Sequence, residues 1–347
     1  MSIDFNALKE KIDNNIDKVL DKEISKAINV DIENSFLELK RLSKGGKRVR
    51  GILIKIGQLL NGVDNNSYLS LATAFEIFQT AVLIHDDIID EADERRGLPT
   101  ITKLNEGHNG ISKAICIGDL GFFLPYIIIN ETDFSAETKF KLEKYFTETL
   151  FNTVIGEIID VELPLKDFDY HLKMEDKEIY DIYVNKTSWY TFTGPLLLGA
   201  ISADMDDKRL KTIIDIGINL GIAFQIKDDL LGLYSTNNEM GKTLNDIKEN
   251  KQTIIYKYAI DHANEGELQI IKNLYGKELN ESDTDILLNL FEELGSRLNA
   301  EKLVEEYTNK AIKTINNSDF DNKEALIDLA SMLVSRNKWP CGHFLFV

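Results

Sequence analysis

Apolar residues recur at intervals of three and four along most of this chain, and this spacing restricts the fold more than any other feature of the sequence. One such run places Leu71, Phe75, Phe78 and Val82 on a single helical face. The sequence has no long alternation of apolar and polar residues, which would mark a half-buried strand. The pattern therefore predicts an all-α protein.

Glycine and asparagine interrupt these runs at residues 44–46, 61–66, 106–110, 235–241 and 276–280. The breaks divide the chain into roughly ten or more helices. Two of them, within residues 71–90 and 211–231, are apolar on more than one face and are therefore expected to be buried. We expect residues 1–347 to form a single-domain bundle around a central apolar cavity, with the acidic ends of these two helices meeting at its mouth.

The composition indicates where such a protein works and what it does not bind. With 43% hydrophobic residues the chain can form a large core, and its two distant cysteines favour a reducing cytoplasm over a disulfide framework. The apolar stretches around residues 120–129 and 194–201 are shorter than the roughly 20 residues of a membrane span. The formal net charge of −18 opposes non-specific binding to nucleic acid. We expect a cytoplasmic protein with no membrane span and no nucleic-acid partner.

The first acidic motif, His-Asp-Asp-Ile-Ile-Asp, closes an apolar helix at residues 85–90. Asp86 and Asp90 are four residues apart and lie side by side, with Asp87 adjacent. Like charges at this spacing repel each other by a few tenths of a kcal/mol unless a cation lies between them. A solvated helix end is the ordinary alternative, but the apolar run before the motif and the arginines after it favour a cation site.

A second acidic pair, Asp228 and Asp229, follows the other apolar helix. Alone it is weak evidence. Two aspartate clusters with little histidine or cysteine nearby suit Mg²⁺, which is usually held by a few carboxylates together with phosphate oxygens of the substrate. The two motifs therefore predict Mg²⁺ and a diphosphate substrate.

Basic residues stand near both acidic motifs, and in so acidic a chain they favour phosphate recognition over ordinary surface salt bridges. They are Lys47, Arg48 and Arg50 in a Gly-Gly-Lys-Arg-Val-Arg run, Arg95 and Arg96 after the first aspartates, Lys186 beside Thr187, and then Lys242 and Lys251.

With these motifs in place, the chain resembles the polyprenyl synthetase family, whose members include farnesyl and geranylgeranyl diphosphate synthases. The likeness spans residues 45–251 and consists of ordered motifs: Gly45 to Arg50, His85 to Thr100, Gly118-Asp119, Lys186-Thr187, Phe224 to Asp229, and Gly241-Lys242 through Asp246 to Lys251. The resemblance implies an isoprenoid synthase type of fold. Together with the apolar character of several helices, it also implies a homodimer.

The resemblance also implies a role for each matching residue. Asp86, Asp90 and Asp228 would bind Mg²⁺, with Asp87 and Asp229 supporting the same cluster. Lys47, Arg50, Gln79 and Arg96 would hold isopentenyl diphosphate. Arg95, Lys186, Thr187, Gln225, Lys242 and Lys251 would hold the allylic diphosphate. The residues predicted to be catalytic are Asp86, Asp87, Asp90, Asp228 and Lys186.

Three positions depart from the common family pattern. Gly232 stands where many relatives have the last aspartate of a second DDxxD, so one carboxylate is lost. Gly51 replaces a frequent proline after the basic motif, and Glu157 replaces a frequent glutamine after Gly156. Metal binding is expected to survive these changes.

The motifs predict a Mg²⁺-dependent trans-prenyltransferase that joins isopentenyl diphosphate to an allylic prenyl diphosphate. A class I terpene cyclase is one alternative, but it needs only one diphosphate site and would not use the second basic set. A non-catalytic subunit of a heteromeric synthase is another, but such a subunit would be expected to lose the aspartates.

Product length is expected to depend on the residues one, two and three turns before Asp86. These are Val82 with Ala81, then Phe78, then Phe75. At about 1.5 Å per residue, Phe78 lies roughly 12 Å from Asp86, near the reach of three isoprene units. Because Ala81 is small, we favour a C20 product, geranylgeranyl diphosphate, with C15 and C25 products as alternatives. Phe75 and Phe78 would otherwise be plain core residues.

Overall fold

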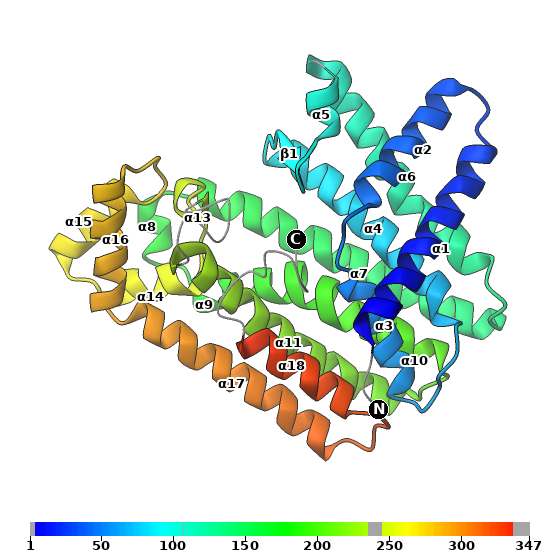
Figure 1. The fold of residues 1–347 in the computed structure, drawn as a ribbon. Coiled ribbons are helices and arrows are strands. Elements are labelled where there is room, and N and C mark those ends of the chain that lie inside the picture. Colours follow the sequence, from blue (N-terminus) through cyan, green and yellow to red (C-terminus); the bar gives the residue numbers. More distant parts are fainter. Residues whose placement is uncertain (1–3, 106, 235–244, 336–347) are drawn as a thin grey trace. The chain divides into compact units, whose positions relative to one another are not determined.

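The computed structural model describes residues 4–105, 107–234 and 245–335. Within these ranges the chain is almost entirely helical, which confirms the all-α prediction (Figure 1). The described strands form one antiparallel hairpin, with Glu94 opposite Pro99 and Arg95 opposite Leu98. Two compact units divide the described residues: the first lies within Met1–Phe146 and Pro195–Asp206, and the second within Thr147–Gly194 and Asp207–His343.

The elements up to residue 162 are α1 Phe5–Ser25, α2 Val30–Ser43, α3 Val49–Leu59, α4 Tyr68–Ile89, β1 Glu94–Arg95, β2 Leu98–Pro99, α5 Ile101–Leu104, α6 Gly107–Asn130 and α7 Ala136–Glu162. Those that follow are η1 Leu163–Leu165, α8 Phe168–His171, α9 Asp176–Ile182, η2 Tyr183–Thr193, α10 Gly194–Ser202, α11 Asp207–Tyr234, α13 Asn245–Lys248, α14 Ile254–His262, α15 Glu265–Leu274, α16 Glu281–Glu293, α17 Ser296–Asn317 and α18 Glu324–Ser335.

In the first unit α4 is the central helix and packs mainly against α6, with α3 on another side. The helices α3 and α10 approach each other closely because both carry glycine at the contact. A Cβ atom at Gly57 would lie 2.2 Å from the Leu196 carbonyl oxygen, and one at Gly199 would lie 1.9 Å from that of Ile54. This backbone packing fixes α3, whose first residues carry the basic motif.

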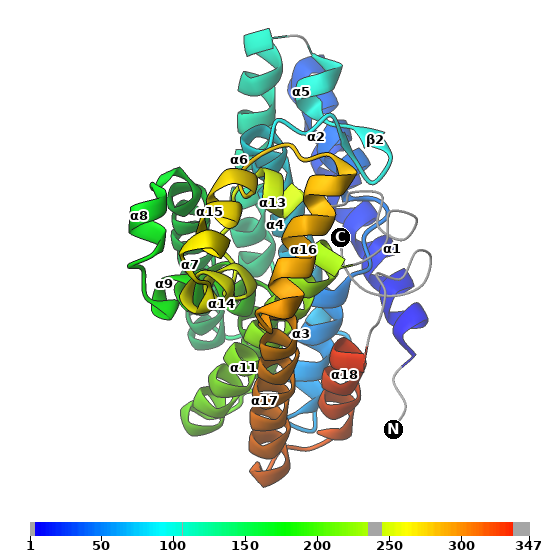
Figure 2. The same cartoon turned by 90° about the vertical axis from the view of Figure 1, so that its left-hand side faces the viewer.

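In the second unit α11 is the central helix and packs against α17 and the π-helix η2. Figures 1 and 2 show α11 and α17 running side by side, with α14, α15 and α16 gathered at one end of α17. Two glycines of α11 allow the contact with η2: a Cβ at Gly217 would lie 2.4 Å from Thr193 Oγ1, and one at Gly221 would lie 2.3 Å from Ser188 Cα.

The predicted central helices agree with α4 and α11, but two details differ from the prediction. The helix α6 begins at Gly107, so the glycine at position 110 is helical rather than part of a break. The helix α11 runs on to Tyr234, which leaves Asp229 more than a turn inside it. The expected break at residues 235–241 lies outside the described residues, and the meeting of the two acidic helix ends stays a prediction.

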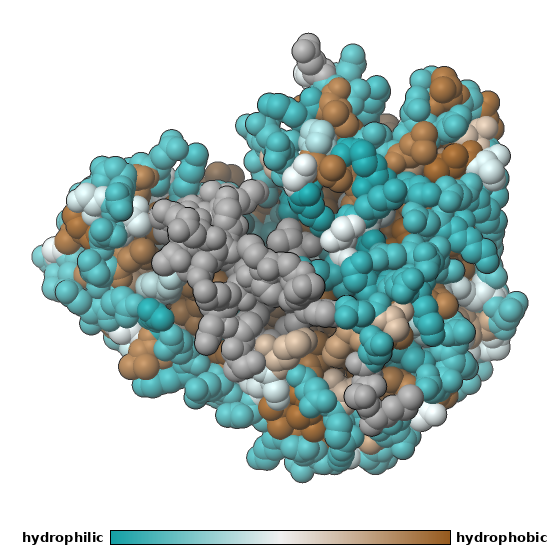
Figure 3. Space-filling model, viewed as in Figure 1, coloured by the Kyte–Doolittle hydropathy of each residue, from teal (hydrophilic) through white to brown (hydrophobic). Residues whose placement is uncertain are grey.

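By length and composition, two of the described helices, α4 and α6, could cross a membrane. In α4 72% of the apolar window is buried, as in the core helix of a folded protein, whereas in α6 the buried share is 39%. The apolar stretch at residues 120–129 is thus part of a longer helix than its sequence suggested. On the face shown in Figure 3, hydrophilic residues cover most of the surface over α1 and α2, and hydrophobic residues form small separate patches.

Candidate active site

In the first unit, Asp86 and Asp87 are held by one arginine. The hairpin that follows α4 turns back and brings Arg95 to them, with Nε donating to Asp87 Oδ1 at 2.7 Å and Nη2 donating to Asp86 Oδ2 at 2.8 Å. The Asp87 side chain is 5% exposed and that of Asp86 is 24% exposed. Asp90, the C-terminal cap of α4, is exposed. The motif therefore presents Asp86 and Asp90 outward and keeps Asp87 inside.

The Gly118-Asp119 motif lies against the same end of α4. A Cβ at Gly118 would lie 2.3 Å from the imidazole of His85, so only glycine lets α6 approach the ring this closely. His85 Nε2 lies 3.3 Å from the Ile115 carbonyl oxygen and 3.7 Å from Asp119 Oδ1. This packing fixes the α4 turn that bears the aspartates.

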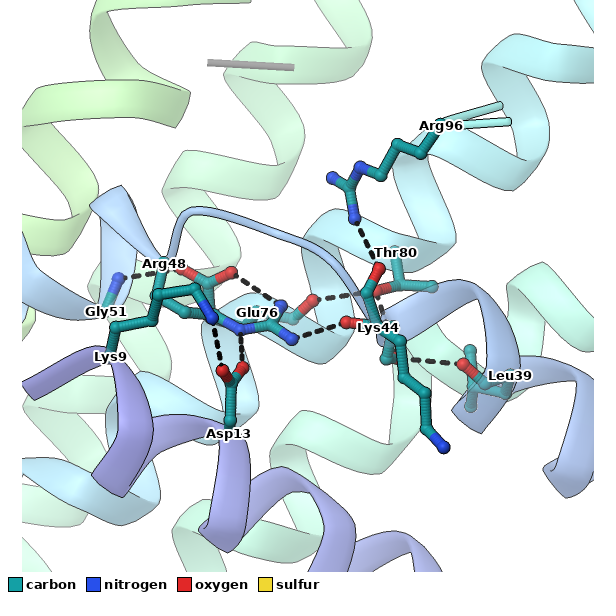
Figure 4. A network of polar contacts seen from close by, with 10 residues as sticks. Lys9, Asp13, Leu39, Lys44, Arg48, Gly51, Glu76, Thr80 and Arg96 are labelled. Atoms are coloured by element: carbon teal, nitrogen blue, oxygen red, sulfur yellow. Dashed lines mark hydrogen bonds and ion pairs between the residues drawn. The ribbon is translucent and has the colours of Figure 1, made fainter. Parts of the chain in front are cut away.

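Residues 44–50, which run from the end of α2 into the first turn of α3 and carry Lys47, Arg48 and Arg50, are called the basic loop. This loop comes close to Arg96, which follows the first acidic motif. Arg96 Nη1 donates to the Lys44 carbonyl at 3.2 Å, which joins the hairpin to the loop (Figure 4). Lys47 and Arg50 are both half-buried, and Gln79 is buried on α4. Of the residues predicted to hold isopentenyl diphosphate, Arg96 thus lies beside the basic loop.

The predicted chain-length residues lie in an aromatic cluster inside the first unit. Phe75 and Phe78 are 0% and 1% exposed, and each packs edge to face on Phe146, with ring centroids 5.8 and 5.5 Å apart. Phe78 also packs against Phe122 of α6 at 5.8 Å. Ala81 is likewise buried, whereas Val82 is half-buried.

Lys186 is the centre of a charged group in the second unit. Its Nζ lies 2.5 Å from Asp160 Oδ2 and 2.9 Å from Glu157 Oε2. A Cβ at Gly156 would lie 2.3 Å from the Lys186 backbone nitrogen, so this glycine lets α7 approach η2. Burial acts to raise the pKa of Asp160, but the charges of Lys186 and then Lys251 outweigh it, and the pKa is lowered.

Four polar side chains form a hydrogen-bonded chain between η2 and α11. Thr187 Oγ1 donates to Gln225 Oε1 at 2.6 Å, and Gln225 Nε2 donates to Asp229 Oδ1 at 2.9 Å. The Tyr183 hydroxyl donates to the other Asp229 oxygen and accepts from the Ile254 N–H at 3.0 Å. Burial, followed by the charge of Asp246, raises the pKa of Asp229 to about 8. Thr187 and Gln225, both predicted from sequence, are thus linked to the second acidic motif.

Asp246 occupies the space that the missing carboxylate leaves at Gly232. A Cβ at Gly232 would lie 2.8 Å from Asp246 Oδ2, so a side chain at that position would collide with this carboxylate. Lys251 follows on the same segment, and its Nζ lies 3.3 Å from Glu249 Oε2. Lys242 lies outside the described residues.

Two residues of this group, Tyr183 and Asp160, are not among the site residues predicted from the sequence. A tyrosine among many offers no sequence signal, because its role depends on an oxygen 46 positions further along the chain. Asp160 had a signal that could have been used: it is a carboxylate directly after the apolar Ile-Ile pair, on a helix face that is otherwise buried.

The donor sets suit a hard cation such as Mg²⁺. The residues predicted to bind it, Asp86, Asp90 and Asp228, are exposed or half-buried carboxylates, while their neighbours Asp87 and Asp229 are buried and hydrogen-bonded. Within the described ranges, no three His, Cys, Asp or Glu side chains form a group that could hold a metal by themselves. Mg²⁺ commonly takes only one or two carboxylates and completes its shell with water and substrate phosphate.

Comparison with known proteins identifies the family. A sequence profile of the polyprenyl synthetase family matches residues 38–293. A geranylgeranyl diphosphate synthase of Sulfolobus acidocaldarius is 32% identical over 308 residues, which cover 85% of this chain and 88% of that protein. A farnesyl pyrophosphate synthase of Candida albicans is 30% identical over 317 residues, covering 85% and 86%.

Among solved structures, a geranylgeranyl pyrophosphate synthase of Corynebacterium glutamicum, complexed with isoprenyl diphosphate and magnesium, superposes with a TM-score of 0.86. It is 25% identical, and the match covers 96% of this chain and 100% of that one. The fold is therefore that of the prenyl diphosphate synthases. The chain belongs to the polyprenyl synthetase family and is a prenyltransferase.

Proposed function

We propose that this prenyltransferase is a Mg²⁺-dependent trans-prenyl diphosphate synthase that condenses isopentenyl diphosphate with an allylic prenyl diphosphate. The observation that carries the proposal is the arrangement of the two aspartate motifs. Each has one accessible carboxylate beside one that is buried and hydrogen-bonded. Arg95 pairs with the first motif, and the charges of Lys251 and Lys186 act on Asp246, whose own charge acts on Asp229 of the second. This arrangement suits a metal-bound diphosphate better than it suits a solvated acidic surface.

Mg²⁺, when bound, stabilises the negative charge that develops on the departing diphosphate. Asp86, Asp90 and Asp228 would supply oxygen ligands to it. Arg95 and Lys186 would neutralise the leaving group by exchanging their present carboxylate partners for phosphate oxygens. Such an exchange keeps both cations paired before substrate arrives, which limits the cost of burying them.

The remaining predicted residues would orient the two substrates. Lys47, Arg50, Gln79 and Arg96 would hold isopentenyl diphosphate so that its double bond faces the allylic carbon, and Thr187, Gln225, Lys242 and Lys251 would complete the allylic site. Holding both reactants in this geometry removes much of the entropic barrier. The C1–O bond of the allylic substrate breaks, a C–C bond forms, and the proton lost from the isopentenyl unit passes to the released diphosphate.

For the product we propose geranylgeranyl diphosphate, because Phe78 is the first aromatic residue of the predicted chain-length set before Asp86 and lies roughly 12 Å from it along the helix. The named relatives include both geranylgeranyl and farnesyl synthases, so family membership alone does not fix the chain length. We also propose a homodimer, supported by an exposed apolar stripe on α6. Its members Ile111, Ile115, Phe123 and Ile127 recur at multiples of four residues.

The test is to incubate the enzyme with labelled isopentenyl diphosphate and dimethylallyl, geranyl or farnesyl diphosphate, and to separate the dephosphorylated products by chromatography. We expect a C20 product that requires Mg²⁺, is lost with EDTA and returns when Mg²⁺ is restored. A main product of C15 or C25 would refute only the chain length. Release of diphosphate from the allylic substrate without isopentenyl diphosphate would instead indicate a cyclase.

A further inference from the structure

Arg48 is the middle cation of the basic loop, yet its side chain is buried and only 4% exposed. Its Nε donates to Asp13 Oδ1 at 2.5 Å, its Nη2 donates to the Ser43 carbonyl at 2.5 Å, and its Nη1 lies 3.4 Å from Glu76 Oε2. Figure 4 shows the guanidinium between these oxygens. All three of its nitrogens face oxygens of the protein itself, so Arg48 is not placed to bind a phosphate.

Two carboxylates surround Arg48, of which Glu76 is buried and Asp13 is 31% exposed. The other Asp13 oxygen pairs with Lys9 at 2.6 Å, outside the contacts that Arg48 makes. Glu76 is 1% exposed and is the only charged residue in the middle of α4, between Tyr68 and Ile84. A carboxylate buried this deeply is stable only when its oxygens are hydrogen-bonded or paired with charge, as they are here.

The second oxygen of Glu76 holds the beginning of α3. The Gly51 N–H donates to Glu76 Oε1 at 2.9 Å, and the negative charge favours the N-terminal end of the helix. Proline, the residue that the family resemblance leads us to expect at this position, has no N–H and could not make the bond. The glycine therefore allows one carboxylate to hold both α3 and Arg48.

The backbone of the loop depends on the same contacts. Arg48 has φ +60° and ψ 30°, a left-handed conformation that residues with a side chain seldom adopt. A Cβ at Gly46 would lie 2.7 Å from Arg48 Nη1 and 3.4 Å from Arg96 Nη1, so the loop passes closely over both side chains. Contacts of the Arg48 side chain, rather than local preference, thus hold this turn.

We propose that Arg48, anchored by Glu76 and Asp13, is a positioning residue that fixes the basic loop and so aims Lys47 and Arg50 at isopentenyl diphosphate. The inference rests on the proposed function. Lys47 precedes Arg48 directly and Arg50 lies in the first turn of α3, so a change in the Arg48 backbone would redirect both side chains. Arg48 acts through these two residues and does not touch the substrate.

The test compares Glu76→Gln and Arg48→Lys with the wild type in steady-state assays and in calorimetric binding of isopentenyl diphosphate. We expect the KM for isopentenyl diphosphate to rise about tenfold, in the direction expected of Lys47→Ala, with the KM for the allylic substrate and kcat within about twofold of wild type. Lys9→Ala is the matched control, because Lys9 contacts Asp13 but not Arg48 and is 37% exposed. It should leave both KM values unchanged.

A direct phosphate contact by Arg48 predicts the opposite result for Glu76→Gln. That change would remove a competing carboxylate, so the KM for isopentenyl diphosphate would fall or stay constant, and the proposal would be overturned. An equal rise in both KM values, or a lower Tm with both KM values unchanged, would also overturn it. Glu76→Gln preserves side-chain shape and keeps the test decisive if Arg48→Lys fails to fold. Absence of turnover in the wild type would refute the proposed function instead.

Discussion

Asp86 and Asp87 are neighbours in the sequence, but their surroundings differ and so should their mutants. We predict that Asp86→Ala, like Asp90→Ala, leaves the fold intact and lowers turnover by several orders of magnitude, because these carboxylates anchor the metal-bound leaving group. Asp87→Ala leaves Arg95 without its most buried partner and should also lower stability, by about 3 kcal/mol or more. Product assays and thermal unfolding of the three variants separate the two effects. A folded Asp86→Ala enzyme with near-normal activity would refute the metal assignment.

For single residues, the sequence predicts how side chains are spaced along a helix, but it does not predict which side chains pair with one another. The four-residue interval of Asp86 and Asp90 follows from helix geometry alone. That Arg95 returns to this motif depends on the turn after α4, where Glu91 has φ +50°, and that Arg48 turns inward depends on Asp13, 35 positions away. The charged residues of the sequence therefore indicate the basic loop, but they do not show that Arg48 is buried while its neighbours Lys47 and Arg50 are half-buried.

Among the elements, α4 is expected to set the product length. We predict that Phe78→Ala lengthens the product distribution, although loss of a buried phenylalanine should also cost about 3–5 kcal/mol of stability. The measurement is chromatography of the dephosphorylated products. Phe122→Ala is a useful companion, because Phe122 belongs to the same cluster but lies on α6.

The reverse change, Ala81→Phe, should shorten the product towards C15. A Cβ at Gly121 would lie 2.8 Å from Ala81 Cβ, so a ring at position 81 must find room against α6. The product of this variant is therefore informative only when thermal unfolding confirms a folded enzyme. If neither Phe78→Ala nor Ala81→Phe changes the distribution of product lengths while both variants remain active, the residues that set product length lie on another helix.

The short helix α8 carries a buried histidine that should make stability depend on pH. Burial lowers the pKa of His171, whose Nδ1 lies 3.2 Å from the Tyr256 hydroxyl and whose Nε2 lies 3.1 Å from the Leu163 carbonyl oxygen. Below about pH 6.5 the unfolded chain binds a proton that the native state resists, so stability falls as pH falls, by up to about 1.4 kcal/mol per pH unit. Above that pH the contribution is constant.

Urea unfolding of wild type and His171→Gln between about pH 7.5 and 5.5 measures this effect. The stability advantage of the wild type should shrink on acidification, because glutamine does not titrate. His262→Gln, at an exposed position in the same unit, is the matched control. A constant difference between wild type and His171→Gln over this range would contradict the prediction.

The positions of the long helices were easier to predict from the sequence than the conformation and contacts of the shorter elements. Apolar periodicity identified α4 and α11 because each is long and buried on several sides. It could not show that residues 183–193 form a π-helix, because that conformation depends on close backbone packing against Gly156, Gly217 and Gly221 from two other helices. A glycine read as part of a helix break can instead be a contact point, as Gly110 is.

For the whole molecule, the all-α class followed from the spacing of apolar residues, and the isoprenoid synthase type of fold followed from the ordered motifs between residues 45 and 251. The net charge of −18 says little about assembly, because exposed charges are screened beyond about 10 Å at moderate ionic strength. The assembly must be inferred from apolar surface instead, and α6 and α7 both expose several large apolar residues.

We predict that the chain forms a homodimer through the apolar stripe of α6 and that Phe123→Asp gives a monomer. Phe123 is 69% exposed and lies between Ile115 and Ile127, which are 44% and 50% exposed on the same helical face. A charge placed in such a contact would lose its hydration without gaining a partner, at a cost of several kcal/mol for each subunit. Ile28→Asp is the control, because Ile28 is 87% exposed but lies between α1 and α2, away from the residues of the α6 stripe in the sequence. Light scattering after size exclusion at micromolar concentration should give a dimer for the wild type and Ile28→Asp, and a monomer for Phe123→Asp. A fully active wild-type monomer would exclude the dimer, and a Phe123→Asp dimer would move the contact to another face.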